Sequence, residues 1–207
     1  MPRAATCGLL LNLLAAPSAL AGVDARALLL GAPPAEDVPA AAAPVEAAPV
    51  PARFGAKDSW RLDIEGEWTG DLDAINLGLG RVGVAWFFID NFEVALYATL
   101  GGASERSADA FVYGGDLEFR WHLFAFDRWS IFASAGCGII GSTEPVPTGG
   151  TEFNFTPCAG AGVTFDVWEG TRLYLSARWF HISNASTSSN NPGFNGLGIW
   201  AGLSFAL

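Results

Sequence analysis

Apolar and polar residues alternate along most of the chain beyond about residue 58. Between residues 111 and 124 the two alternating sets are Phe111, Tyr113, Leu117, Phe119, Trp121 and Leu123 on one side and Asp116, Glu118, Arg120 and His122 on the other. Successive side chains of a β-strand point to opposite faces, so this pattern predicts a strand with one apolar and one charged face. Residues 60–68 and 171–182 show the same alternation.

Turns of alternating length separate these segments. The predicted strands cover residues 59–68, 75–88, 92–100, 111–125, 129–140, 153–167, 171–182 and 195–205. Short links fall at 90–91, 127–128 and 169–170, and longer polar links at 69–74, 101–110, 141–152 and 184–193. Outer-membrane barrels alternate short periplasmic turns with longer extracellular loops. The sequence therefore predicts an all-β fold, an eight-stranded antiparallel transmembrane β-barrel of the bacterial outer membrane, with a bulge near Gly80 and Arg81 where the alternation changes phase.

The direction of the apolar face separates two classes of barrel. A soluble sandwich or lipocalin would bury the apolar face, whereas an outer-membrane barrel turns it toward lipid. The composition favours the second class, because 51% of the residues are hydrophobic, only 15% are charged and eight are Trp. Leu62, Leu117, Leu173 and Leu203 are then expected to face lipid. Inside, Asp63, Glu65, Glu67, Glu93, Asp116 and Glu118 are expected to pair with Arg61, Arg120, Arg172 and Arg178 as a structural network.

The first 57 residues differ from the barrel in composition. Arg3, a short apolar run and the Ala19-Leu20-Ala21 sequence predict a signal peptide over residues 1–21, since the run is too short for a membrane anchor. Residues 22–57 are rich in Pro and Ala and predict a disordered periplasmic linker. The barrel is expected to occupy residues 58–207.

Charge and cysteine content narrow the function further. A net charge of −10 argues against binding to nucleic acid, whose phosphates require a basic surface. Two histidines, one of them predicted in the lumen, do not make a metal site, and no cofactor motif occurs. Cys137 and Cys158 flank one loop almost symmetrically, but the alternation places them on different faces, so the sequence leaves their pairing as a disulfide open.

Chemically suggestive residues occur near the end of the seventh predicted strand. His181 and Ser183 lie two positions apart and therefore share a face, the lipid-facing one. A hydroxyl beside an imidazole is the minimum for an activated serine nucleophile, and the following Asn184 could donate to an oxyanion. Spacing alone does not decide between catalysis and the ordinary polar rim of a barrel.

A longer motif carries a resemblance to a known family. His181-x-Ser183-Asn184-Ala185, followed by Asn191-Pro192-Gly193-x-Asn195 and a last strand, resembles the outer-membrane lipid A 3-O-deacylases, the PagL family, and their acyloxyacyl hydrolase-like relatives. The resemblance implies an eight-stranded barrel that hydrolyses an ester of lipopolysaccharide. It implies His181 as general base, Ser183 as nucleophile and Asn184 as a contributor to the oxyanion site.

One position departs from the family pattern. The family has a glutamate early in the last strand that orients the histidine, but this chain has no acid between Glu169 and Leu207. Counting from His181 places the equivalent position at Asn195, and counting from Pro192 places it near Gly198. Asn195 shares the lipid-facing phase and is the better candidate for the third catalytic position, where its amide oxygen could accept a hydrogen bond from the imidazole.

The expected function is an outer-membrane serine-type hydrolase that removes an ester-linked acyl chain from lipid A, with lipopolysaccharide as substrate and no cofactor. Two alternatives stay open. One is a non-enzymatic structural or adhesion barrel, which the missing acid favours, and the other is a soluble exported lipid-binding barrel. The sequence also leaves open which ester is cut and whether the barrel forms a homodimer.

Overall fold

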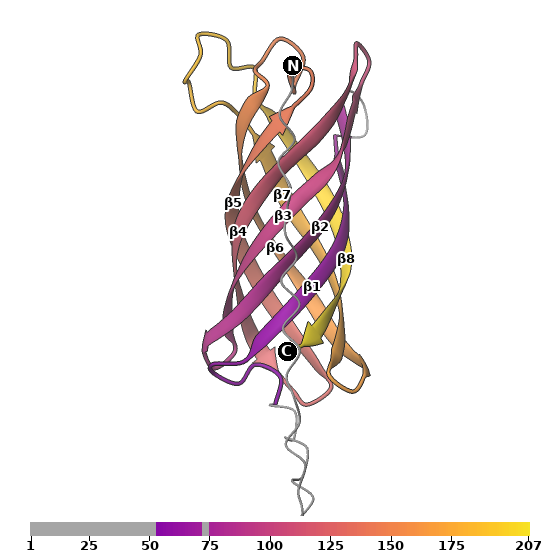
Figure 1. Ribbon diagram of the computed structural model, residues 1–207, viewed down its shortest axis with the longest axis vertical. Coiled ribbons are helices and arrows are strands. Elements are labelled where there is room, and N and C mark those ends of the chain that lie inside the picture. Colours follow the sequence, from indigo (N-terminus) through magenta and orange to yellow (C-terminus); the bar gives the residue numbers. More distant parts are fainter. Residues whose placement is uncertain (1–52, 72–74) are drawn as a thin grey trace, which may run out of the picture. The chain divides into compact units, whose positions relative to one another are not determined.

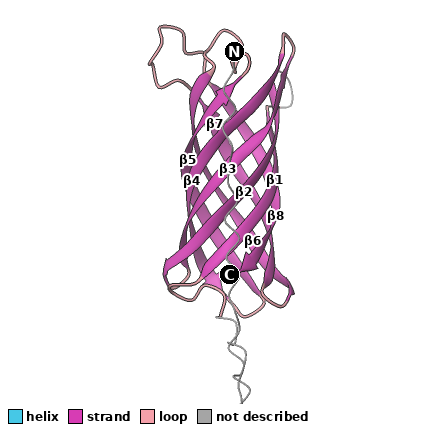
Figure 2. Ribbon diagram, in the orientation of Figure 1, coloured by secondary structure: helices cyan, strands magenta, loops and turns pink. Residues whose placement is uncertain are grey.

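A computed structural model describes residues 53–71 and 75–207 of the chain. Eight strands form a single closed barrel in which each strand pairs with its neighbours in sequence and β1 pairs with β8, all antiparallel (Figures 1 and 2). The strands are β1 Trp60–Gly70, β2 Ile75–Ile89, β3 Phe92–Glu105, β4 Asp109–Ala125, β5 Trp129–Ser142, β6 Phe153–Trp168, β7 Thr171–Ile182 and β8 Phe194–Ala206. These two ranges contain no helix long and apolar enough to cross a membrane. The prediction of an eight-stranded antiparallel barrel is confirmed.

Several strands are longer than the alternation predicts. β3 and β4 pair as far as Ser104 and Asp109, so that only a few residues form the connection between them. Antiparallel backbone hydrogen bonds do not require apolar side chains, and the polar ends of these strands therefore continue the ladder beyond the apolar band. Short turns lie at the lower end of the barrel in Figure 1, and the two long loops of residues 143–152 and 183–193 lie at the upper end.

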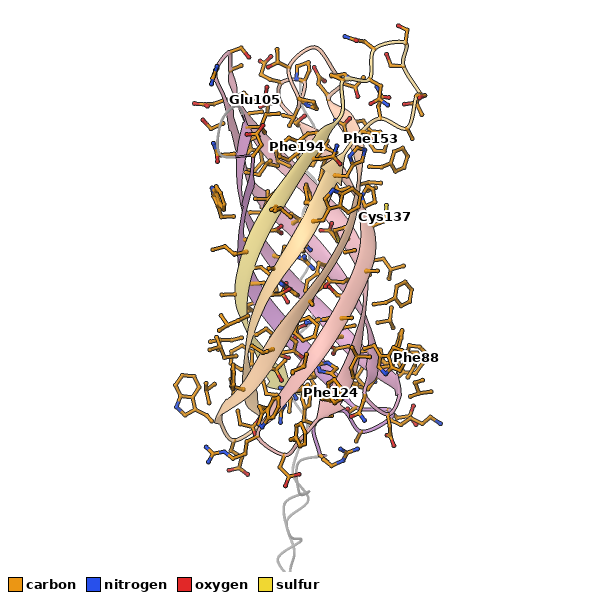
Figure 3. All side chains as sticks on the ribbon, turned by 180° about the vertical axis from the view of Figure 1, so that it is seen from behind. Phe88, Glu105, Phe124, Cys137, Phe153 and Phe194 are labelled. Atoms are coloured by element: carbon orange, nitrogen blue, oxygen red, sulfur yellow. The ribbon has the colours of Figure 1, made fainter. Side chains whose placement is uncertain are left out.

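Large apolar side chains cover the outer surface of the barrel. Leu96 is 61% exposed, Leu117 is 43% exposed and Leu197 is 70% exposed. Figure 3 shows Phe124 and Phe153 among the side chains that project from the wall. Their polar neighbours along the same strands are buried, as in the alternation of Glu118 with Leu117. This arrangement is the reverse of a water-soluble barrel and is typical of a barrel surrounded by lipid.

An arginine on the outer surface should be costly in proportion to its depth. Leu117 lies in the middle of β4, and Leu117→Arg is expected to lower the free energy of unfolding by about 2–4 kcal/mol in lipid. Phe111→Arg, near the loop end of the same strand, should cost only about 0–1 kcal/mol. Reversible unfolding in phospholipid vesicles measures both values, and equal costs at the two depths would contradict the lipid-facing assignment.

A network of charged side chains fills the lumen. Arg120 contacts Asp63 at 2.6 Å and Glu93 at 3.1 Å. Arg178 bonds Glu67, and Arg172 contacts Asp166 at 2.7 Å. The predicted set is buried throughout, although two members find neutral partners: Arg61 donates to Ser204, and Asp116 accepts from Thr99 and Thr156. The network ties strands on opposite sides of the barrel together and fills the interior as a structural network would.

The predicted bulge near Gly80 and Arg81 is wrong. β2 pairs with β3 without interruption through this region, and the register shift between the two strands lies instead between Phe87 and Ile89. Leu77 and Leu79 point into the lumen on the same face as Arg81. The alternation fails here because the upper lumen is apolar, with Leu77, Val112, Ile182 and Phe194 in one buried cluster. Arg81, absent from the predicted network, contacts Glu118 at 2.7 Å.

The segment that precedes β1 packs against the short-turn end of the barrel. The ring of Phe54 lies edge-on to Phe87 and His122, with centroid distances of 5.3 and 5.0 Å. The guanidinium carbon of Arg172 lies 3.7 Å from its centroid. Asn91 N donates to Gly55 O at 2.8 Å. The predicted linker of residues 22–57 thus ends in a packed segment from Phe54 onward, and residues 22–52 lie outside the described part of the chain, as does the predicted signal peptide.

Phe54 is expected to contribute to stability although it precedes the barrel in sequence. Phe54→Ala should lower the free energy of unfolding by about 2 kcal/mol, less than a fully buried Phe because the ring is half-buried. Deletion of residues 31–52 should leave it nearly unchanged, because a Pro/Ala-rich segment cannot form a packed core. Heat-modifiable gel migration and unfolding measurements on the two variants test these expectations. A larger loss of stability from the deletion than from Phe54→Ala would contradict them.

The two barrel cysteines lie on different faces of the wall. Cys137 is exposed on the outer surface, Cys158 is buried, and both are free. Cys137 pairs with Pro157, whereas Cys158 pairs with Gly136. Residues one register step apart in a strand point to opposite faces, which explains why no disulfide joins them.

Candidate active site on the outer wall

The candidate residues come together at the loop end of the β7–β8 hairpin. The long gold loop at the upper end of Figure 1, residues 183–193, connects these two strands. The β7–β8 register places His181 directly opposite Asn195. Both residues belong to the outward-facing set, so their side chains lie on the lipid-facing surface at the edge of the apolar band.

His181 and Asn195 form a hydrogen bond. Nδ1 of His181 lies 3.0 Å from Oδ1 of Asn195. The amide oxygen can only accept, so Nδ1 carries the hydrogen of this bond, and the neutral imidazole that makes it has its lone pair on Nε2. Gly198, the other position considered for the orienting group, faces inward, where a Cβ would lie 1.9 Å from Thr69 Oγ1. Of these two positions, Asn195 is therefore the one that contacts the histidine.

Ser183 is held by the neighbouring strand. It forms an isolated β-bridge with Phe155 of β6, in which Phe155 N donates to Ser183 O at 2.8 Å and Ser183 N donates to Phe155 O at 3.1 Å. This bridge keeps Ser183 in the outward phase of His181 beyond the end of β7. Within the described residues no hydrogen bond joins the Ser183 hydroxyl to the imidazole. In enzymes without substrate, catalytic hydrogen bonds are often long and tighten in the complex.

Asn184 organises the loop. Its Oδ1 accepts from Ser186 N at 2.9 Å, and its Nδ2 donates to Asn190 O at 2.8 Å. Its backbone N–H donates to Asn191 Oδ1 at 3.1 Å. The residue is 1% exposed and lies on the opposite face from Ser183. These bonds give the side chains of Asn184 and Asn191 a structural role in the loop, and they leave one Nδ2 hydrogen of Asn184 for another acceptor.

Gly193 lies beside the imidazole and has a function that the sequence pattern did not reveal. Its φ of +64° belongs to the left-handed region. A Cβ at this position would lie 3.7 Å from His181 Cε1. A side chain larger than Cβ would crowd the ring, and L-residues are strained at this φ. Gly193 therefore lets the loop return to β8 close to the histidine.

Two apolar grooves adjoin the site on the outer wall. One, of about 410 Å³, is lined by Trp68, Trp179, Asn195 and Leu197. The other, of about 790 Å³, runs over β4, β5 and β6 and includes Phe153 and Phe155, the residue that bridges to Ser183. An extended apolar group that reached the site would therefore have a groove on either side.

His122, the second histidine, is buried in the lumen, as predicted. Its Nδ1 lies 2.8 Å from Ser130 Oγ and its Nε2 lies 3.2 Å from Glu93. In the described part of the chain no three His, Cys, Asp or Glu side chains are grouped in a way that could hold a metal ion. The site consists of a hydroxyl, an imidazole and an amide on a lipid-facing wall.

The fold and the position of this site define a class: eight-stranded outer-membrane barrels with polar, enzyme-like residues on the outer wall. The family model of the lipid A 3-O-deacylases (PagL) matches residues 52–204. The chain belongs to this family of hydrolases, and it is a protein of the outer membrane.

Solved structures agree on the fold. The crystal structure of the outer membrane enzyme PagL has a TM-score of 0.50 and 20% identity, and the match covers 69% of this chain and 97% of that one. The crystal structure of Neisserial surface protein A (NspA) has a TM-score of 0.54 and 13% identity, with 72% and 96% coverage. No curated protein sequence matches the chain.

Proposed function

We propose that this protein hydrolyses an acyl ester of lipid A with Ser183 as nucleophile, His181 as general base and Asn195 as the group that orients the histidine. The observation that carries the proposal is the His181–Asn195 hydrogen bond, formed on the lipid-facing wall beside Ser183. Membership of the lipid A 3-O-deacylase family supports a lipid A deacylase and favours the 3-O position.

The chemistry follows the logic of other serine hydrolases. Ser183 Oγ attacks the ester carbonyl carbon while its proton passes to His181 Nε2. The tetrahedral intermediate collapses, the C–O bond to the sugar breaks, and the leaving oxygen takes the proton from the imidazolium. Water, deprotonated by Nε2, then attacks the acyl-enzyme carbonyl carbon. The bond from this carbon to Ser183 Oγ breaks, Oγ takes the proton from the imidazolium, and the fatty acid leaves. Asn195 holds the ring by its Nδ1–H throughout.

The oxyanion role expected for Asn184 receives weaker support than the other three roles. Its carbonyl oxygen and one amide hydrogen are committed to the loop. The residue is also 1% exposed and lies on the opposite face from Ser183, so we assign the oxyanion to backbone N–H groups of the same loop. Asn184 fixes the loop that follows the nucleophile.

The surroundings of the site suit a membrane lipid better than a water-soluble ester. The polar residues lie at the end of the apolar band, where the headgroup of an outer-leaflet lipid meets its acyl chains. The grooves beside Trp179 and Phe155 continue from the site along the apolar wall. A lipid could thus present its ester to Ser183 while its chains stay in apolar surroundings.

Purified, folded barrel mixed with lipid A in detergent micelles tests the proposal. We expect fatty acid to be released in proportion to enzyme, with one acyl chain lost from each product molecule. Heat-unfolded protein is the control. A folded barrel that releases no fatty acid from lipid A would instead support the non-enzymatic alternative.

A further inference from the structure

Trp179 contacts both His181 and Asn195. Its indole Nε1 donates to Asn195 Oδ1 at 3.2 Å. Its ring stacks on the imidazole with a centroid distance of 5.8 Å and an interplanar angle of 17°. The Asn195 oxygen therefore accepts two hydrogen bonds, one from each residue. Of the two contacts of Trp179, the one with Asn195 runs diagonally between β7 and β8, and the one with His181 runs along β7.

The asparagine creates a difficulty that a glutamate would not. A carboxylate has two equivalent acceptor oxygens, whereas an amide has one acceptor end and one donor end. If the NH₂ end faced His181, Nδ1 would have to accept and the proton would move to Nε2. A serine hydrolase with an amide in the orienting position and the wrong imidazole tautomer loses about 10⁴-fold in kcat. Activity with Asn195 therefore depends on which end of its amide faces the ring.

We propose that Trp179 is a positioning residue that sets this orientation: its indole N–H, which can only donate, holds the Asn195 oxygen toward His181 and keeps the imidazole in the Nδ1–H tautomer. Nε2 is then free to take the proton of Ser183. The expected effect of Trp179 on catalysis rests on the proposed function. Its expected effect on the imidazole tautomer does not depend on that function.

Stacking adds a second effect of the same residue. In the transition state His181 becomes an imidazolium, which a glutamate would stabilise by its charge. The face of an aromatic ring within about 6 Å attracts a cation, and Trp is the most effective ring for this. Trp179 meets this condition and partly replaces the missing charge.

Kinetics in two backgrounds separate this role from simple packing. Trp179→Phe keeps an aromatic face and removes only the N–H. We expect it to lower kcat about five- to tenfold with little change in KM, since one neutral hydrogen bond shifts an equilibrium by about this factor. In the Asn195→Asp background, whose carboxylate needs no orientation, the same substitution should change kcat less than about twofold.

Trp129→Phe is the matched control. Trp129 is also on the lipid-facing surface, 38% exposed, but it stacks on Phe126 at the other end of the barrel. It should leave kcat unchanged. An equal loss from Trp179→Phe in the wild-type and Asn195→Asp backgrounds, or no loss in either while wild type is active, would overturn the positioning role and leave the proposed hydrolase standing.

Nitrogen NMR of the imidazoles tests the tautomer without any activity. The chain has only two histidines, and His181→Gln identifies the signals of His181 by their loss. At about pH 8.5, where imidazoles are ordinarily neutral, wild type should show the Nδ1–H form of His181. Trp179→Phe should raise the Nε2–H form several-fold. An unchanged tautomer in this variant would overturn the inference, even if the barrel proved to have no hydrolase activity.

Discussion

Ser183→Ala is expected to lower the release of fatty acid from lipid A by on the order of 10⁴- to 10⁶-fold while leaving the barrel folded. The hydroxyl is the only group in the proposed site that can form the acyl-enzyme. His181→Ala should cost nearly as much, because nucleophile and base act as one unit. The double variant should be little worse than either single one. Initial rates in detergent micelles, with heat-modifiable migration as the check on folding, give these values.

Ser189→Ala provides the control for this prediction. Ser189 is an exposed serine of the same loop, so its replacement changes the composition of the loop without touching the proposed site. It should retain the wild-type rate. Near-normal release by Ser183→Ala would rule out Ser183 as the nucleophile, and additive losses in the double variant would show that His181 acts independently of it.

The second large effect is expected at Asn195. Asn195→Ala should lower kcat by about 10²-fold, because the imidazole loses the acceptor that fixes its orientation and tautomer. Asn195→Glu should match or exceed the wild-type rate, since a carboxylate at this position stabilises the imidazolium that forms in the transition state.

The pH–rate profile is expected to shift when Asn195 is replaced by Glu. A carboxylate favours the protonated imidazole, and the base must be neutral to accept the proton of Ser183. The acid limb of the pH–rate profile should therefore move to higher pH in Asn195→Glu, while the plateau rate rises. Full profiles of kcat for wild type and Asn195→Glu measure both changes. A silent Asn195→Ala would place the orienting group elsewhere.

Most of the barrel could be predicted from alternation because one rule, a lipid-facing apolar side and a polar lumen, governs nearly every strand. The rule fails where the lumen itself is apolar, and Leu77 and Leu79 consequently suggested a bulge that does not exist. Phe54 could not be assigned to the fold, because it lies in a Pro/Ala-rich segment and its contacts are with residues distant in sequence.

Part of the candidate site could also be predicted from the alternation of the strands. Phase alone selected Asn195 over Gly198, and the register then places Asn195 opposite His181. The loop-ordering role of Asn184 depends on loop conformation, and the hydrogen bond from Trp179 to Asn195 depends on diagonal packing. No periodicity encodes either of them. Gly193 could be recognised as a turn residue but not as a neighbour of the imidazole.

Mass spectrometry of lipid A from a bacterial host without such hydrolases tests the proposed deacylation most directly. The host would carry the wild-type gene, Ser183→Ala or an empty vector, with equal amounts of the two proteins verified in the outer membrane. We expect lipid A that has lost one ester-linked acyl chain with wild type, and intact lipid A in the other two strains. Intact lipid A with folded wild-type protein, or the same loss with Ser183→Ala, would contradict the proposal.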